Sequence, residues 1–131
     1  MILLFIVGCN KVGEDIEILN PYARIAPKDG SSAVYMKIKN NQGMEDTLYE
    51  AYCNCANITE LHETIKKGDM MEMKKIDYLV IKDKLSLEPG GLHVMLINLK
   101  EDLRENDTIE LVLKFKKSGE KKIKVPVKKL E

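Results

Sequence analysis

Apolar and polar side chains alternate along most of this chain. In three segments, residues 34–38, 109–115 and 123–127, every second side chain is apolar. This period of two is typical of strands that bury one face. Turn-forming residues separate the segments, and the closest approach to a helix, residues 100–105, is about one turn long. The pattern predicts an all-β protein with a single domain, folded as an antiparallel sandwich or barrel.

The last of these strands is rich in lysine. Eight lysines lie between residues 114 and 131, against only Glu120 and Glu131. Pro126 also falls inside the strand and has no N–H to donate to a neighbour. We therefore expect this strand at an edge of the sheet, where lysines protect it from further pairing. The alternative is a basic surface for an acidic partner.

Composition excludes several classes of function. The 131 residues are enough for one domain with a real core, and 44% of them are hydrophobic. Lys plus Arg equals Asp plus Glu at 21 each, so the chain is not a polycationic nucleic-acid binder. Aromatic residues make up 5% with no Trp, which argues against an aromatic platform for sugars or nucleobases.

The first eight residues form a continuous apolar run, which is too short for a membrane span of about 20 residues. The run leads into Ile6-Val-Gly-Cys9, which resembles a bacterial lipobox whose cysteine receives a lipid. In this interpretation residues 1–9 are a lipoprotein signal, residues 10–15 a tether and residues 16–131 the domain. The domain would then work outside the cytoplasm, touching the membrane only through its anchor. The alternative is an N-terminal core strand with Cys9 as a small buried side chain.

Both histidines and four of the seven methionines fall within residues 61–96. Four of these residues follow the spacing His-x10-Met-x19-His-x-Met: His62, Met73, His93 and Met95. Strand alternation places His93 and Met95 on one face, opposite the apolar Leu92, Val94 and Leu96. The same argument places His62 opposite Leu61. Neither histidine is therefore expected in the core.

Two imidazoles and two thioethers form a specific kind of donor set. Thioethers are soft ligands that favour Cu(I), whereas zinc sites use thiolate, imidazole and carboxylate. Thioethers also do not form disulfides, so such a site keeps its ligands in an oxidising compartment. The implied cofactor is Cu(I). Taken singly, each methionine is more typical of core or surface, and His62 of a structural histidine.

Several segments, together with this spacing, resemble one known family, the periplasmic copper chaperones that supply the binuclear copper site of cytochrome c oxidase. The segments are Asn20-Pro-Tyr-Ala-Arg24, Ser32-Ala-Val-Tyr-Met36, Glu60-Leu-His62, Met71-Glu-Met73 and Leu87-Glu-Pro-Gly-Gly-Leu-His-Val-Met95. The interval of nineteen residues is two shorter than is usual in that family, and we place the shortening near residues 82–84. The resemblance covers about residues 16–127.

The resemblance implies a cupredoxin-like antiparallel β-sandwich that binds Cu(I) through His62, Met73, His93 and Met95. An auxiliary methionine of the family is replaced here by Thr64, which leaves Met71 as a candidate substitute. The implied function is delivery of copper by ligand exchange to a cytochrome c oxidase subunit or another copper chaperone, without catalysis. The alternative is a structural or adhesive β-sandwich lipoprotein with no metal site.

The resemblance does not explain Cys53-Asn-Cys55, whose two thiols would share one strand face. Three interpretations stay open. The pair consists of two structural thiols, of a readily reduced disulfide, or of ligands of an auxiliary Cu(I) site or hand-off relay.

Overall fold

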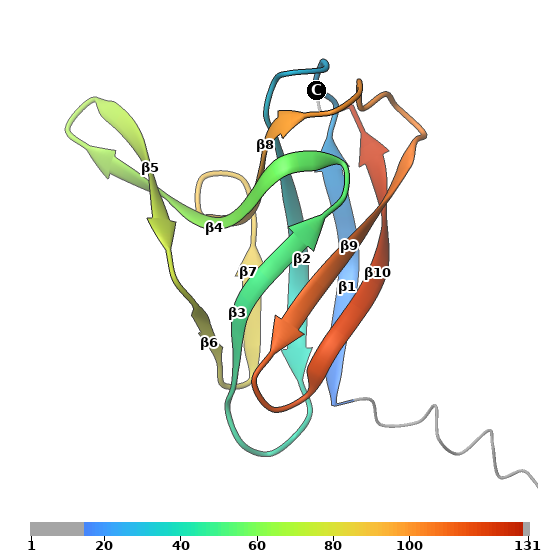
Figure 1. Cartoon of the computed structure of the whole chain (residues 1–131). Coiled ribbons are helices and arrows are strands. Elements are labelled where there is room, and N and C mark those ends of the chain that lie inside the picture. Colours follow the sequence, from blue (N-terminus) through green and yellow to red (C-terminus); the bar gives the residue numbers. More distant parts are fainter. Residues whose placement is uncertain (1–14, 130–131) are drawn as a thin grey trace, which may run out of the picture.

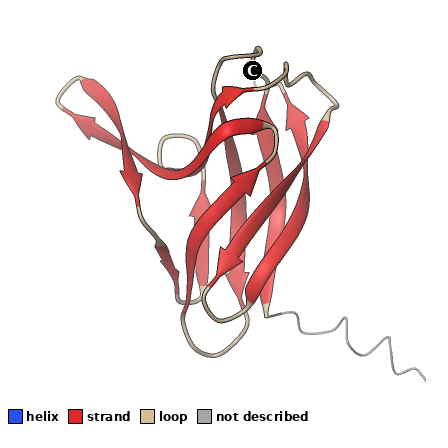
Figure 2. Cartoon of the chain, viewed as in Figure 1, coloured by secondary structure: helices blue, strands red, loops and turns tan. Residues whose placement is uncertain are grey.

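The computed structural model describes residues 15–129, and every regular element in that range is a strand (Figures 1 and 2). The strands are β1 (Ile16–Arg24), β2 (Ser32–Asn40), β3 (Asp46–Cys53), β4 (Ala56–Lys67), β5 (Met70–Ile76), β6 (Leu79–Ile81), β7 (Lys84–Leu87), β8 (Leu92–Leu99), β9 (Thr108–Phe115) and β10 (Gly119–Lys128). The three alternating segments lie in β2, β9 and β10, so the prediction of an all-β domain is confirmed. The apolar run, Cys9 and most of the expected tether lie outside the described residues.

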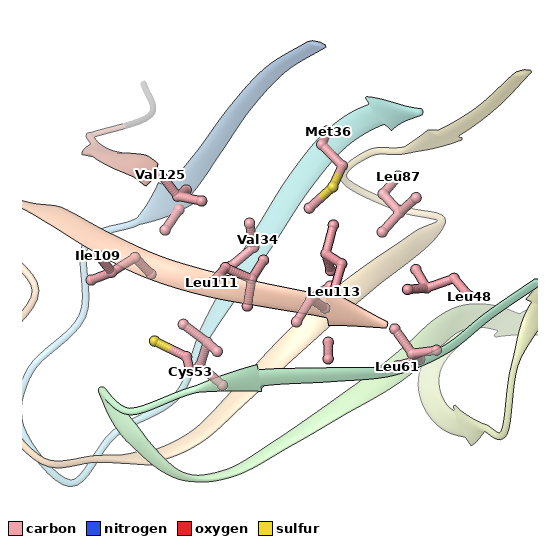
Figure 3. Packing of buried hydrophobic residues seen from close by; sticks show 14 of the residues in the cluster. Val34, Met36, Leu48, Cys53, Leu61, Leu87, Ile109, Leu111, Leu113 and Val125 are labelled. Atoms are coloured by element: carbon pink, nitrogen blue, oxygen red, sulfur yellow. The ribbon is translucent and has the colours of Figure 1, made fainter. Parts of the chain in front are cut away.

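The strands form one continuous ladder in the order β5-β4-β8-β2-β1-β10-β9-β3-β6, and β7 also pairs with β2. All pairings are antiparallel except that of β1 with β10, which is parallel. The ladder curls so that β2 faces β9 across the hydrophobic core (Figure 3). The result is a two-layered sandwich whose outer faces are available for chemistry.

The core is built from the apolar sets that alternate along each strand. Val34 on β2, Val94 on β8 and Leu111 on β9 are fully buried. Figure 3 shows Leu61 of β4 pointing into the same cluster, toward Leu113. Because neighbouring side chains on a strand point to opposite faces, the residues beside these anchors point outward.

One expectation from the sequence is wrong. The lysine-rich strand β10 is not an edge strand, since it lies between β1 and β9. Val127 N–H donates toward the β9 side, to Asp107 O, so Pro126 N faces β1. There the pairing with β10 begins only at Ala23 and Val127, next to an irregularity in β1 between Leu19 and Tyr22. The absence of an N–H on Pro126 therefore removes no hydrogen bond between β10 and β1.

Residues 100–105 form no helix. Leu103 instead makes an isolated bridge with Ala26, and their backbone groups exchange hydrogen bonds of 2.8 and 3.1 Å. Leu103, which is 6% exposed, thus closes the sandwich with its apolar side chain and does not start a helix. Within residues 15–129, no helix has the length and apolar character needed to cross a membrane.

A buried carboxylate ties two loops together at one end of the sandwich. Asp46 accepts hydrogen bonds from Thr47 N, Lys117 N, Ser118 N and Oγ, and Gln42 Nε2. Burial alone would raise the pKa of this carboxyl, but the hydrogen bonds outweigh it and hold the pKa of Asp46 well below its usual range. The ionised form is therefore part of the folded structure.

Replacing Asp46 with Asn is expected to destabilise the fold by about 2 to 3 kcal/mol at neutral pH, because several donors lose a charged acceptor. A folded-state pKa that is depressed contributes stability above the unfolded pKa near 3.9, and this contribution is lost as the pH falls below it. Denaturant unfolding of wild type and Asp46→Asn at pH 7 and pH 3 measures both effects. The difference should shrink at pH 3, and the exposed control Asp69→Asn should show no difference at either pH.

Candidate metal centre

The two histidines lie directly opposite each other on neighbouring strands. His62 of β4 is the register partner of His93 of β8, and their ring centroids are 5.8 Å apart. The adjacent pair, Leu61 and Val94, is buried in the core at 4% and 0% exposure. The histidines therefore occupy the opposite face, as the alternation predicts.

One nitrogen of each ring is held by a hydrogen bond that defines its role. His62 Nε2 lies 2.8 Å from Glu60 Oε1, and His93 Nδ1 lies 3.2 Å from Gly91 O. A carboxylate and a carbonyl only accept, so both of these nitrogens carry the proton. In the neutral rings, the lone pairs are then on His62 Nδ1 and His93 Nε2.

Those two lone-pair nitrogens are buried and have no hydrogen-bond partner among the described residues. Buried polar atoms are normally satisfied, so an unpaired nitrogen on each of two facing rings requires an explanation. Imidazole nitrogens bind metals at about 2 Å, and the spacing of the rings lets one ion contact both. The hydrogen bonds to Glu60 and Gly91 are the outer-shell contacts that orient metal-binding histidines.

The two methionines flank the histidine pair on the same face of the sheet. Met95 of β8 is opposite Glu60, two residues from the His62–His93 pair. Met73 of β5 is opposite Thr64, two residues from His62 in the other direction. Diagonal neighbours of this kind lie within reach of long side chains. The ladder thus brings all four sequence-predicted residues to one surface.

Met71 also lies on this face of β5, opposite Lys66, whereas Met70 is on the other face. Met71 is further along the hairpin than Met73 and is 61% exposed. The register therefore places Met71 at the rim of the candidate site.

The site is closed at His93 and open at Met73. His93 is 2% exposed, whereas Met73 is 54% exposed. As predicted, His93 lies on the face opposite the hydrophobic core, but it is buried there. Tyr35 of β2 explains the difference, because its ring lies 6.1 Å from that of His93 and is itself buried.

The surroundings of His93 favour its neutral ring. Burial lowers the pKa of His93, the hydrogen bond to Gly91 O opposes this effect, and the neighbouring His62 lowers the pKa further. Glu60 also lies 3.8 Å from Lys75 Nζ through its second oxygen. The neutral form of an imidazole is the form that binds a metal.

Comparison with known proteins identifies the family. Residues 16–127 match the family described as "LpqE-like: Putative lipoprotein LpqE-like". The chain belongs to the LpqE-like family. A relative from Leifsonia xyli subsp. xyli (strain CTCB07), named "Putative lipoprotein Lxx21020", is 28% identical over 97% of this chain and 84% of its own length.

Solved structures of similar fold are copper-protein domains. The structure described as "Solution structure of CuI-DR1885 from Deinococcus Radiodurans" is 27% identical, with a TM-score of 0.68 over 93% of this chain and 86% of that one. The "Copper-bound PCuAC domain from PmoF2" is 23% identical, with a TM-score of 0.73 over 91% and 97%. The cupredoxin-like fold and the resemblance to periplasmic copper chaperones are thereby confirmed.

Three further groups contact the histidines of this LpqE-like chain and were not predicted: the Glu60 carboxylate, the Gly91 carbonyl and the Tyr35 ring. The contact of Glu60 could have been predicted from the sequence. Residues two apart on a strand share a face, so an acidic side chain two residues before His62 can reach its ring. Tyr35 comes from a strand distant in sequence, and no local pattern reveals its contact with His93.

The cysteine pair is not part of this site. Cys53 and Cys55 are joined by a disulfide, which agrees with the second of the three interpretations. They lie at the turn before β4, where Cys53 belongs to the hydrophobic core and Cys55 packs against it, whereas the histidines lie on the opposite face of the sheet. Any metal role for these sulfurs is therefore separate from the histidine pair.

The hydrogen bonds predict fixed and different tautomers for the two rings. In the metal-free protein, His62 should carry its proton on Nε2 and His93 on Nδ1, as measured by long-range 1H–15N correlation NMR at neutral pH. Glu60→Ala should leave His93 unchanged and convert His62 to a mixture of tautomers. Equal tautomer mixtures for both rings in the wild type would contradict this assignment.

Proposed function

We propose that this protein is an extracytoplasmic Cu(I) carrier, not an enzyme, which holds its ion with His62, Met73, His93 and Met95 and passes it to an acceptor cuproprotein. The observation that carries the proposal is the presence of one buried imidazole nitrogen without a partner on each of two rings whose centroids are 5.8 Å apart. The two thioethers on the same face complete a donor set suited to a soft monovalent ion. The copper-bound domains of similar fold support the same choice of metal.

The uneven exposure of the ligands supports transfer by ligand exchange. The histidine nitrogens hold the ion from the buried side, and Met73 reaches it from the exposed hairpin. An acceptor ligand approaches from the open side and displaces Met73 first, then Met95, before the imidazoles release. The ion therefore moves between donor sets without being freed into water. We propose a copper site of cytochrome c oxidase, or another copper chaperone, as the acceptor.

The site should bind one Cu(I) per chain. Anaerobic titration with Cu(I) in competition with bicinchoninate measures stoichiometry and affinity. His62→Ala should abolish stoichiometric binding, and Met95→Leu should weaken it by more than about 100-fold, since outer-shell changes alone cost 10- to 100-fold. Copper-edge X-ray absorption of the loaded protein should show both nitrogen and sulfur neighbours.

Met70→Leu is the matched control, because Met70 lies on the same strand as Met73 but faces away from the site. It should bind Cu(I) like the wild type, whereas Met73→Leu should not. Equal affinities for these two variants, or no tight binding by the wild type, would leave a structural or adhesive sandwich as the better description.

We further propose that a lipid at Cys9 anchors the domain, with residues 10–15 as a tether. The lipobox-like Ile6-Val-Gly-Cys9 supports this, as do the lipoprotein descriptions of the family and of the relative from Leifsonia xyli. Expressed in a bacterial host, the full chain should be recovered with membranes and should incorporate labelled palmitate. Cys9→Ser should lose both properties, while Cys55→Ser should keep them. Label in the Cys9→Ser chain would refute the anchor.

A further inference from the structure

The Cys53–Cys55 disulfide links residues only two apart in sequence. A bond that closes so short a loop restricts the unfolded chain little, so its contribution to stability is small compared with that of a long-range disulfide. Two hydrogen bonds already hold the turn, one from Cys53 N to Thr59 Oγ1 at 3.1 Å and one from Lys100 N to Cys55 O at 2.9 Å. A purely structural role therefore explains this disulfide poorly.

The two cysteines differ in exposure, and both residues line an open pocket. Cys53 is buried at 1% exposure, whereas Cys55 is half-buried. The pocket has a volume of about 630 Å³ and lies between the turn and the segment before β9. Thiol–disulfide exchange requires access to a sulfur atom. Because Cys55 is the more exposed cysteine and lines this pocket, a small thiol reductant can approach it from there.

The surroundings favour an open dithiol and a cation. Cys55 N–H already points at Cys53 Sγ at 3.3 Å, and an N–H donor stabilises a thiolate. Four carboxylates line the pocket against one lysine: Glu101, Asp102, Asp107 and Glu110 against Lys100. A negatively charged rim attracts a cation rather than an anionic partner.

We propose that Cys53 and Cys55 form a second Cu(I) site that is available only when their disulfide is reduced by a dithiol. The first thiolate of the reductant attacks Cys55 Sγ, the Cys53–Cys55 bond breaks, and Cys53 leaves as a thiolate that takes up a proton. The second thiolate of the reductant then displaces Cys55. Two electrons pass to the protein, and the reductant becomes a disulfide.

The reduced pair has the chemistry that Cu(I) prefers. Thiolates are soft ligands, and the Cα atoms of the two cysteines are 5.1 Å apart, so both sulfurs reach one ion. Binding of Cu(I) releases the two thiol protons, because the thiolate is the form that coordinates. The site differs from the proposed histidine–methionine centre in place and in dependence on reduction.

The test uses the full chain carrying Cys9→Ser, so that Cys53 and Cys55 are its only thiols. One sample is kept oxidised, and the other is reduced with dithiothreitol and desalted anaerobically. Both are titrated with Cu(I) against bicinchoninate. The reduced sample should bind one Cu(I) more than the oxidised sample. Resistance of the folded protein to reduction, seen as unreactive thiols, or equal stoichiometry of the two samples overturns the proposal.

Two variants separate this site from the first one. Cys55→Ser, chosen because Cys55 is less buried than Cys53, should lose the additional ion under reducing conditions and keep the rest. His62→Ala should bind no ion when oxidised and one when reduced. Retention of the additional ion by Cys55→Ser refutes the cysteine site. Failure of the oxidised wild type to bind copper refutes only the histidine–methionine centre.

Discussion

The functional face of this protein depends on one constraint, the direct register of β4 with β8. Leu61 and Val94 hold that register because they fill the core, and the histidines beside them are then forced to face each other. A slip of β4 by one residue would bury the His62 imidazole in the core and expose Leu61, so competing registers are strongly disfavoured. The unpaired nitrogens cost about 1 to 3 kcal/mol each in the empty protein, and a bound ion removes that cost.

The turn before β8 connects this register to the chemistry of the site. Gly90 adopts a positive φ of 86°, which a residue with a side chain rarely adopts, and Gly91 N–H then donates to Glu88 O. The Gly91 carbonyl accepts from Thr64 N at 3.0 Å and from His93 Nδ1 at 3.2 Å. One peptide group therefore aligns the two strands and sets the tautomer of a candidate ligand.

Local patterns in the sequence predict which face each side chain occupies, since that depends only on alternation along a strand. They do not predict which strands become neighbours. Pro126 and the lysines around it predict an edge strand. Their strand nevertheless pairs with β1, which lies more than 80 residues earlier, and this pairing places it inside the ladder. The burial of His93 has the same origin, because it depends on Tyr35 from β2. For the cysteine pair, the sequence left three interpretations open, and the structure adds that the two sulfurs are joined in a disulfide.

The hairpin of β4 and β5 projects from the sandwich at the left of Figure 1, and β5 is hydrogen-bonded within residues 15–129 only to β4. The arm that carries Met73 and the strands that form most of the core are thus in separate parts of the chain. If the proposed site carries copper, substitutions in the seven residues of β5 change the rate of copper release while the packed core stays the same. Under the proposed function, family members that deliver copper to different acceptor proteins should accordingly differ most in the sequence of this hairpin.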